Sequence, residues 1–172
     1  FRSMNEPDVT SEIRSTYPVL RDRHPLLTGD AVLPTAPIRE VAALVFDRAL
    51  RFRSSIAFWA HPLCGKSSCI SALKRLSMEL FPESAFVIYE PSYKDVAAEG
   101  ALIEDLLSVI DYEAKIQRSL AGKRDQLARA LYAMAVTGRH LFLVIDEAQN
   151  LLVKELGWLK RVVNWLNARD IK

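Results

Sequence analysis

The chain has 172 residues, about half of them hydrophobic and about a quarter charged, which is the composition of a globular protein with roughly one domain. Its net charge of +2 is too small to indicate a nucleic-acid-binding protein, although a local basic patch is not excluded. The purely apolar runs, such as Leu141–Ile145, are far too short to cross a bilayer, so we expect a cytoplasmic protein with no membrane partner.

The cysteine and histidine content gives no sign of a metal centre. Cys64 and Cys69 are the only cysteines, and we expect both to be reduced thiols. No further cysteine or histidine stands at ligand spacing from them. The three histidines are scattered and are interpreted as surface or packing residues: His24, His61 and His140.

The first 34 residues are expected to form an irregular, mostly extended arm that packs on the domain. Four prolines interrupt any long helix in this arm, namely Pro7, Pro18, Pro25 and Pro34. Residues 1–3, which precede Met4, are expected to be foreign to the natural protein. The domain proper is expected to span residues 35–172. It begins with a helix that Pro37 starts and that runs to about Phe52 on one apolar stripe.

The next stretch predicts a binding site for the phosphates of a nucleotide. An apolar strand, Ile56–Trp59, is followed by a short loop and by a helix that begins at about Lys66. Gly65 would let the main chain approach an anion, Lys66 would reach the β and γ phosphates, and the Ser67 hydroxyl would bind Mg²⁺. The alternative is an accidental turn and helix cap. We disfavour it because the motif lies between a strand and a helix, as its chemistry requires.

The motif G-x-x-x-x-G-K-[ST] departs from its usual form at one position, because Ala60 stands where the first glycine is expected. If this position requires a left-handed backbone, alanine costs about 1 kcal/mol, whereas it costs nothing if the backbone is extended. The following helix is expected to end at Leu80, because Pro82 stops it. We expect the whole loop to bind the nucleotide, through Ala60, His61, Pro62, Leu63, Cys64, Gly65, Lys66, Ser67 and Ser68.

After this helix the pattern predicts one more strand and two helices. Ala85–Tyr89 is a short β-prone run between two prolines, as expected for a buried strand. One helix is expected over residues 96–110, and another over residues 123–137 with Gly138 as its stop. Residues 111–122 either prolong the first of these helices or form a connecting turn.

The second informative stretch is Leu141–Ile145, which predicts a strand buried on both faces and is followed directly by two acids. Ligands in open α/β sheets bind at the carboxyl ends of the strands, so Asp146 and Glu147 are expected at the same rim as the phosphate loop. Asp146 would hold Mg²⁺ through water, and Glu147 would orient or deprotonate the attacking water. The alternative is an exposed acidic pair that caps the next helix, which is expected over residues 154–167.

The order of these elements and the two motifs resemble the P-loop ATPases of the AAA+ superfamily. Within it, the ending DEAQNL is most similar to the transposon target-selection ATPases of the TniB and TnsC type, in a branch that also holds ExeA-like secretion ATPases and origin-recognition proteins. The resemblance covers residues 37–150. It implies a three-layer α/β fold with a parallel sheet, with Walker A residues at Gly65–Ser67 and Walker B residues at Asp146 and Glu147.

The resemblance also implies a sheet with the strand order 5-1-4-3-2, of which this chain supplies three strands. The fourth and fifth strands and the helical lid are expected to be absent from the chain, which therefore resembles a truncated ATPase core. The fourth strand would lie between Ile56–Trp59 and Leu141–Ile145. We expect this gap to be filled by a rearranged pairing, by a strand from a second copy, or by direct pairing of the two strands.

By this resemblance the protein is expected to be an ATP-hydrolysing switch, with ATP and Mg²⁺ as ligands, that regulates DNA transposition by ATP-dependent assembly on double-stranded DNA. Its expected partners are DNA, further copies of itself in a ring or filament, and a transposase. The chain alone is expected to hydrolyse ATP weakly or not at all. Two other classes stay open: a nucleotide-binding scaffold or signalling module with little or no ATPase activity, and a secretion or chaperone-like AAA+ motor with no DNA partner.

Overall fold

The computed structural model describes residues 35–51 and 55–172. The chain divides into two units, residues 1–35 and 36–172, and every helix and strand described here belongs to the second. The arm expected over residues 1–34 lies outside the described residues.

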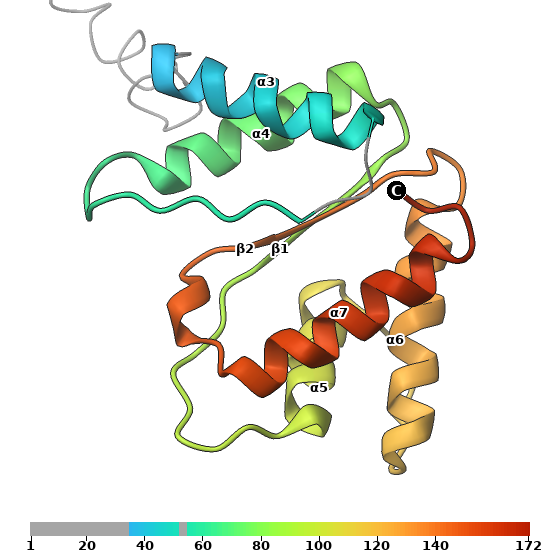
Figure 1. Ribbon diagram of the computed structural model, residues 1–172. Coiled ribbons are helices and arrows are strands. Elements are labelled where there is room, and N and C mark those ends of the chain that lie inside the picture. The colour runs from blue at the N-terminus through green and yellow to red at the C-terminus, as the bar shows by residue number, and fades with distance from the viewer. Residues whose placement is uncertain (1–34, 52–54) are drawn as a thin grey trace, which may run out of the picture. The chain divides into compact units, whose positions relative to one another are not determined.

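Helices and strands alternate in the second unit as expected for an α/β protein (Figure 1). The elements are α3 (Ala36–Arg51), α4 (Lys66–Leu80), β1 (Ala85–Tyr89), α5 (Glu99–Val109), α6 (Leu120–Ala135), β2 (Leu141–Ile145), the 3₁₀ helix η1 (Ala148–Asn150) and α7 (Val153–Asn167). Both strands and α4 have their predicted bounds. In the described part of the chain, no helix has the length and apolar character that a membrane span needs.

Two helix boundaries differ from the prediction by three residues, and the others differ by two residues or fewer. α5 begins at Glu99 rather than at residue 96, and α6 begins at Leu120 rather than at residue 123. The earlier start of α6 has a local cause, because the Ser119 hydroxyl accepts a hydrogen bond of 3.1 Å from the Gly122 N–H and so caps the helix. Within residues 111–122, the connection therefore ends at Ser119, and the last three residues form the first turn of α6.

β1 and β2 form a two-stranded parallel sheet that runs from Ala85 opposite Leu141 to Tyr89 opposite Ile145 (Figure 1). One more hydrogen bond continues the ladder past the strands, because the Asp146 N–H donates to the Tyr89 carbonyl at 2.9 Å. The carboxyl ends of the strands are thus level with each other. The segments that follow them meet at one rim.

Helices cover both faces of this sheet, as the alternation of side chains along a strand requires. Figure 1 shows α3 and α4 on one side of the two strands and α5, α6 and α7 on the other. Val87 packs in one apolar cluster with α5, α6 and α7, whereas Phe86 and Phe142 pack on the opposite face with α3 and α4. The buried residues of the α3 and α4 cluster are Ala42, Phe46, Leu73 and Phe81.

The strand predicted at Ile56–Trp59 does not form. Residues 55–60 have no regular secondary structure, and Trp59 is 83% exposed. A strand needs a neighbour for its backbone hydrogen bonds, and the sheet of the described residues contains β1 and β2 alone. The prediction was wrong because it relied on β-prone composition, which does not supply a partner strand. The gap left by the fourth strand is therefore not filled by direct pairing of residues 56–59 with β2, which was one of the three expected ways to fill it.

The edge of β2 that faces away from β1 is paired only at its start, as far as the described residues show. The Leu141 N–H donates to the Lys172 carbonyl, and the Lys172 N–H donates to the Arg139 carbonyl, both at 2.8 Å. This is the pattern of a parallel pair, formed here by a single residue. The outward backbone groups of Leu143 and Ile145 have no partner within the described residues.

Gly138 is required for a close approach of two backbone segments. A Cβ atom at this position would lie 2.4 Å from the Glu83 carbonyl oxygen and 2.7 Å from the Ser84 nitrogen. The left-handed residue of the turn is not Gly138 but Arg139, with φ of +58°. Gly138 therefore lets the turn before β2 lie against the residues that precede β1.

Glu99 joins the three helices on one face of the sheet. Arg124 of α6 donates two hydrogen bonds to its carboxylate, at 2.8 and 2.6 Å, and Arg161 of α7 donates one at 3.0 Å. The Glu99 side chain is only 10% exposed. The hydrogen bonds from Arg124 hold the pKa of Glu99 below its usual value.

Candidate active site

The phosphate loop makes a tight turn at the start of α4. Gly65 has φ +79° and ψ 28°, a left-handed conformation, and it precedes Lys66, the first residue of the helix. Leu63 also has a positive φ, of +63°, and its side chain is exposed. Ala60 does not have a positive φ, so alanine at the first glycine position of the motif causes no left-handed strain.

The first turn of α4 presents unpaired backbone N–H groups. Among the described residues, no acceptor contacts the N–H groups of Gly65, Lys66, Ser67 or Ser68, and the first helical bond runs from the Cys69 N–H to the Gly65 carbonyl at 2.9 Å. No acidic residue lies in this turn, and no side chain caps it. These N–H groups and the positive end of the helix dipole therefore suit an anion.

The two acids lie on a turn that begins where β2 ends. The Glu147 N–H donates to the Asp146 carboxylate at 2.9 Å, and Glu147 itself is left-handed, with φ of +50°. The 3₁₀ helix η1 follows at once. This turn brings both carboxylates to the rim of the sheet instead of continuing the strand.

The loop and the acids come together, although they are far apart in the sequence. The Ser67 hydroxyl donates to the Asp146 carboxylate at 3.4 Å, and the Lys66 ammonium lies 3.8 Å from the Glu147 carboxylate. The side chains of Lys66 and Glu147 are each 36% exposed. The structure thus gathers the four residues expected to carry the chemistry in one accessible place.

Two polar residues of this region were not predicted to have a role. The Gln149 side-chain amide donates to the second oxygen of the Glu147 carboxylate. The Asn150 side-chain amide donates to the Pro91 carbonyl at 3.0 Å and so ties the acidic turn to the loop after β1. Both belong to the motif DEAQNL, which is the sequence signal that could have identified them. The spacing of a motif does not, however, show which atoms a side chain contacts.

The oxygen atoms at this site suit Mg²⁺ that arrives with a nucleotide. The Ser67 hydroxyl and the Asp146 carboxylate are hard oxygen donors that lie next to each other. The described residues include no group of three or more His, Cys, Asp or Glu side chains that would bind a metal ion without help. Since Mg²⁺ in such proteins takes one or two protein ligands plus phosphate oxygens and water, the donor set fits this ion.

Most of the remaining residues of the predicted loop are exposed. The residues His61, Pro62, Cys64 and Ser68 are exposed, while Ala60 is half-buried. The His61 ring packs edge-on against Trp59, with ring centroids 4.7 Å apart. Both cysteines are free thiols, as expected, and burial raises the pKa of Cys69.

The family model of an AAA domain matches residues 51–172, which include both motifs and all the elements from α4 onward. The chain belongs to the AAA domain family. As an AAA domain it is a P-loop ATPase of the AAA type, a class of proteins that bind nucleotide. No curated protein and no solved structure matches the chain.

Family membership confirms the AAA part of the resemblance. The parallel pair of strands with flanking helices fits an incomplete α/β P-loop core. In this AAA domain, the segment expected to be the first strand of the core is the one that lacks regular structure. Its phosphate loop nevertheless lies beside the acids at the end of β2.

Proposed function

We propose that this AAA domain binds ATP with Mg²⁺ at the loop of residues 60–68 and hydrolyses it to ADP and phosphate. The observation that supports this most directly is the meeting of the two motifs, in which Ser67 contacts Asp146 and Lys66 contacts Glu147. These contacts place one cation, one hydroxyl and two carboxylates around the free N–H groups at the start of α4.

Each of these groups has a distinct role in the proposal. The N–H groups of residues 65–68 and the Lys66 ammonium bind the phosphates. Ser67 and Asp146 hold Mg²⁺, which neutralises charge on the β and γ phosphates when it is bound. Glu147 orients the attacking water and accepts its proton. Since Lys66 now contacts Glu147, phosphate binding would withdraw Lys66 and free that carboxylate oxygen for water.

Nucleotide binding is the first test, because it does not depend on turnover. Affinity for fluorescent ATP is measured for the parent, for Lys66→Ala and for the control Lys74→Ala, which removes a lysine from the same helix farther from the loop. Lys66→Ala should abolish measurable binding, whereas Lys74→Ala should bind like the parent. Equal binding by Lys66→Ala and the parent would remove the proposal.

We further propose that hydrolysis serves a switch in DNA transposition, in which copies of the protein assemble on double-stranded DNA and act on a transposase. This part is supported by the form of the motif that starts at Asp146, DEAQNL. Residues 35–172 would form the ATPase core, and the first 34 residues an arm attached to it.

Turnover with and without duplex DNA tests the switch. DNA should raise the rate of the parent but not that of Glu147→Gln, and DNA affinity should fall steeply as salt rises. ATP binding without turnover would instead favour a nucleotide-binding scaffold. DNA-independent turnover would favour an AAA motor without a DNA partner.

A further inference from the structure

β1 is an edge strand whose outer side has no partner in the described part of the chain. The Ala85 N–H donates to the His140 carbonyl at 3.0 Å, so in this parallel ladder the odd-numbered residues of β1 face β2. The N–H and C=O groups of Phe86 and Ile88 therefore point away from β2. Within the described residues, no backbone or side-chain group bonds to them. Four polar backbone groups are thus open to an added strand.

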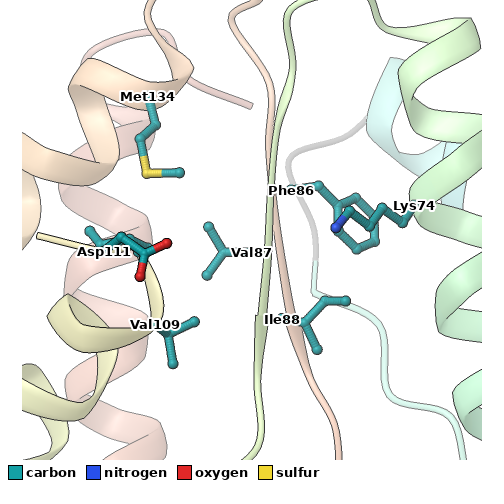
Figure 2. A pocket seen from close by; sticks show the side chains of 8 residues that line it. Lys74, Phe86, Val87, Ile88, Val109, Asp111 and Met134 are labelled. Atoms are coloured by element: carbon teal, nitrogen blue, oxygen red, sulfur yellow. The ribbon is translucent and has the colours of Figure 1, made fainter.

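A hollow of about 300 Å³ follows this edge and extends over both faces of the strand (Figure 2). On the α4 side it is lined by Phe86 and Ile88, and on the side of α5 and α6 by Val109 and Met134 (Figure 2). Ile88, Val109 and Met134 are 36%, 42% and 40% exposed, which is unusual for large apolar side chains that lie together. The edge is therefore flanked by apolar surface on both faces.

Two opposite charges lie on opposite sides of the edge. Lys74 of α4 lies beside Phe86, and Asp111, just after α5, lies across the strand beside Met134 (Figure 2). Neither side chain forms an ion pair with another described residue. Because successive residues of a strand point to opposite faces, a bound strand with an acid next to a base would place each charge beside its opposite.

We propose that this edge with its hollow, the β1 groove, binds an extended peptide segment of a partner protein that has an acidic and a basic residue in adjacent positions among β-branched residues. An extended peptide is the ligand whose own N–H and C=O groups recur at the two-residue spacing that Phe86 and Ile88 offer. Lys74 and Asp111 then select the charge pattern, and the apolar flanks take the remaining side chains. None of the residues that line the β1 groove belongs to the proposed ATPase site, so the two sites are separate.

The probe is a blocked peptide, acetyl-Thr-Val-Glu-Lys-Val-Thr-amide, added at millimolar concentration to the isotope-labelled full chain. The amide resonances of Phe86 and Ile88 should shift, and hydrogen exchange at these two amides should slow. The control is a peptide of the same sequence that is N-methylated on the residues facing β1, so that it lacks the N–H groups that would donate to the carbonyls of β1. Only the peptide is altered in this control, and it should bind at least about tenfold more weakly. The absence of any change at the two amides, or equal binding of the N-methylated peptide, would overturn the proposal.

Variants of the protein test the two components of the groove. Ile88→Pro removes the outward N–H but leaves the ladder with β2, so it should lose about tenfold in affinity, whereas the matched Ile88→Val should bind like the parent. Lys74→Glu should weaken binding about fivefold. ATP affinity stays unchanged in all three, which separates this proposal from the ATPase proposal. If the chain without peptide is a dimer with both edge amides protected, a second copy occupies the groove and the proposal fails.

Discussion

Alanine at Gly138 and alanine at Gly157 should change stability in opposite directions. A Cβ at Gly138 would lie 2.4 Å from the oxygen and 2.5 Å from the carbon of the Glu83 carbonyl. Both atoms belong to backbone, so no side-chain rotation relieves the clash. Overpacking of this kind costs about 1–3 kcal/mol, which corresponds to a melting temperature lower by roughly 3–10 °C for a chain of this size. At Gly157, within α7, a Cβ meets no atom within 4 Å, so alanine should stabilise by about 0.5–1 kcal/mol.

The assay is thermal unfolding of the two variants and the parent, followed by far-ultraviolet circular dichroism under identical conditions. Glycine to alanine is the same chemical change in both variants, so their difference reports the surroundings of each position. Gly138→Ala should unfold first, then the parent, then Gly157→Ala. If Gly138→Ala were as stable as the parent, the close approach between the turn before β2 and the residues before β1 would not constrain the fold.

Three further predictions concern charge, backbone and coupling. Glu99→Gln should flatten the loss of stability in acid, because the hydrogen bonds from Arg124 lower the pKa of Glu99 in the folded state. Their contribution to stability is complete above the pKa of Glu99 in the unfolded chain and is lost as pH falls through the lower folded-state pKa, so melting temperatures measured from pH 7 to pH 3 would test it. Gly65→Ala should cost about 1 kcal/mol of stability and weaken ATP binding, because the left-handed φ of +79° strains alanine, and a variant with unchanged melting and ATP affinity would contradict this. Asn150→Ala should slow hydrolysis more than it weakens ATP binding, since it frees the acidic turn from the Pro91 carbonyl, and a selective loss of affinity would count against that role.

Sequence patterns predicted the elements whose signals are local. β1 and β2 are short apolar runs between breakers, and their bounds were predicted correctly, as were those of α4. The predicted start of α6 was wrong because the prediction did not include Ser119 as the cap of the helix. Ile56–Trp59 has the composition of a strand but no neighbour, and the presence of a partner strand is a property of the whole sheet rather than of the segment.

The candidate site shows the same division between local and non-local information. Motif spacing correctly anticipated that Lys66 and Ser67 would lie near Asp146 and Glu147, because parallel strands carry their loops to one rim. It did not anticipate that Gln149 would contact the Glu147 carboxylate, since such contacts depend on side-chain conformation. The composition of Ala85–Tyr89 describes burial and not pairing, but the open edge of β1 agrees with the strand order 5-1-4-3-2, in which the second strand lies at the edge of the sheet.

The two helical layers differ greatly in how much apolar surface holds them to the sheet. On the side of α3 and α4, four of the described residues are buried in the cluster, whereas the cluster of α5, α6 and α7 buries fourteen, including Leu107 and Leu131. Native-state opening should therefore begin in the thinner layer, while the thicker one persists almost to global unfolding. Because the phosphate loop leads directly into α4, a bound nucleotide would act on the less extensively packed of these two layers. Protection of the α4 amides from exchange would then report nucleotide binding before any change in α5, α6 and α7.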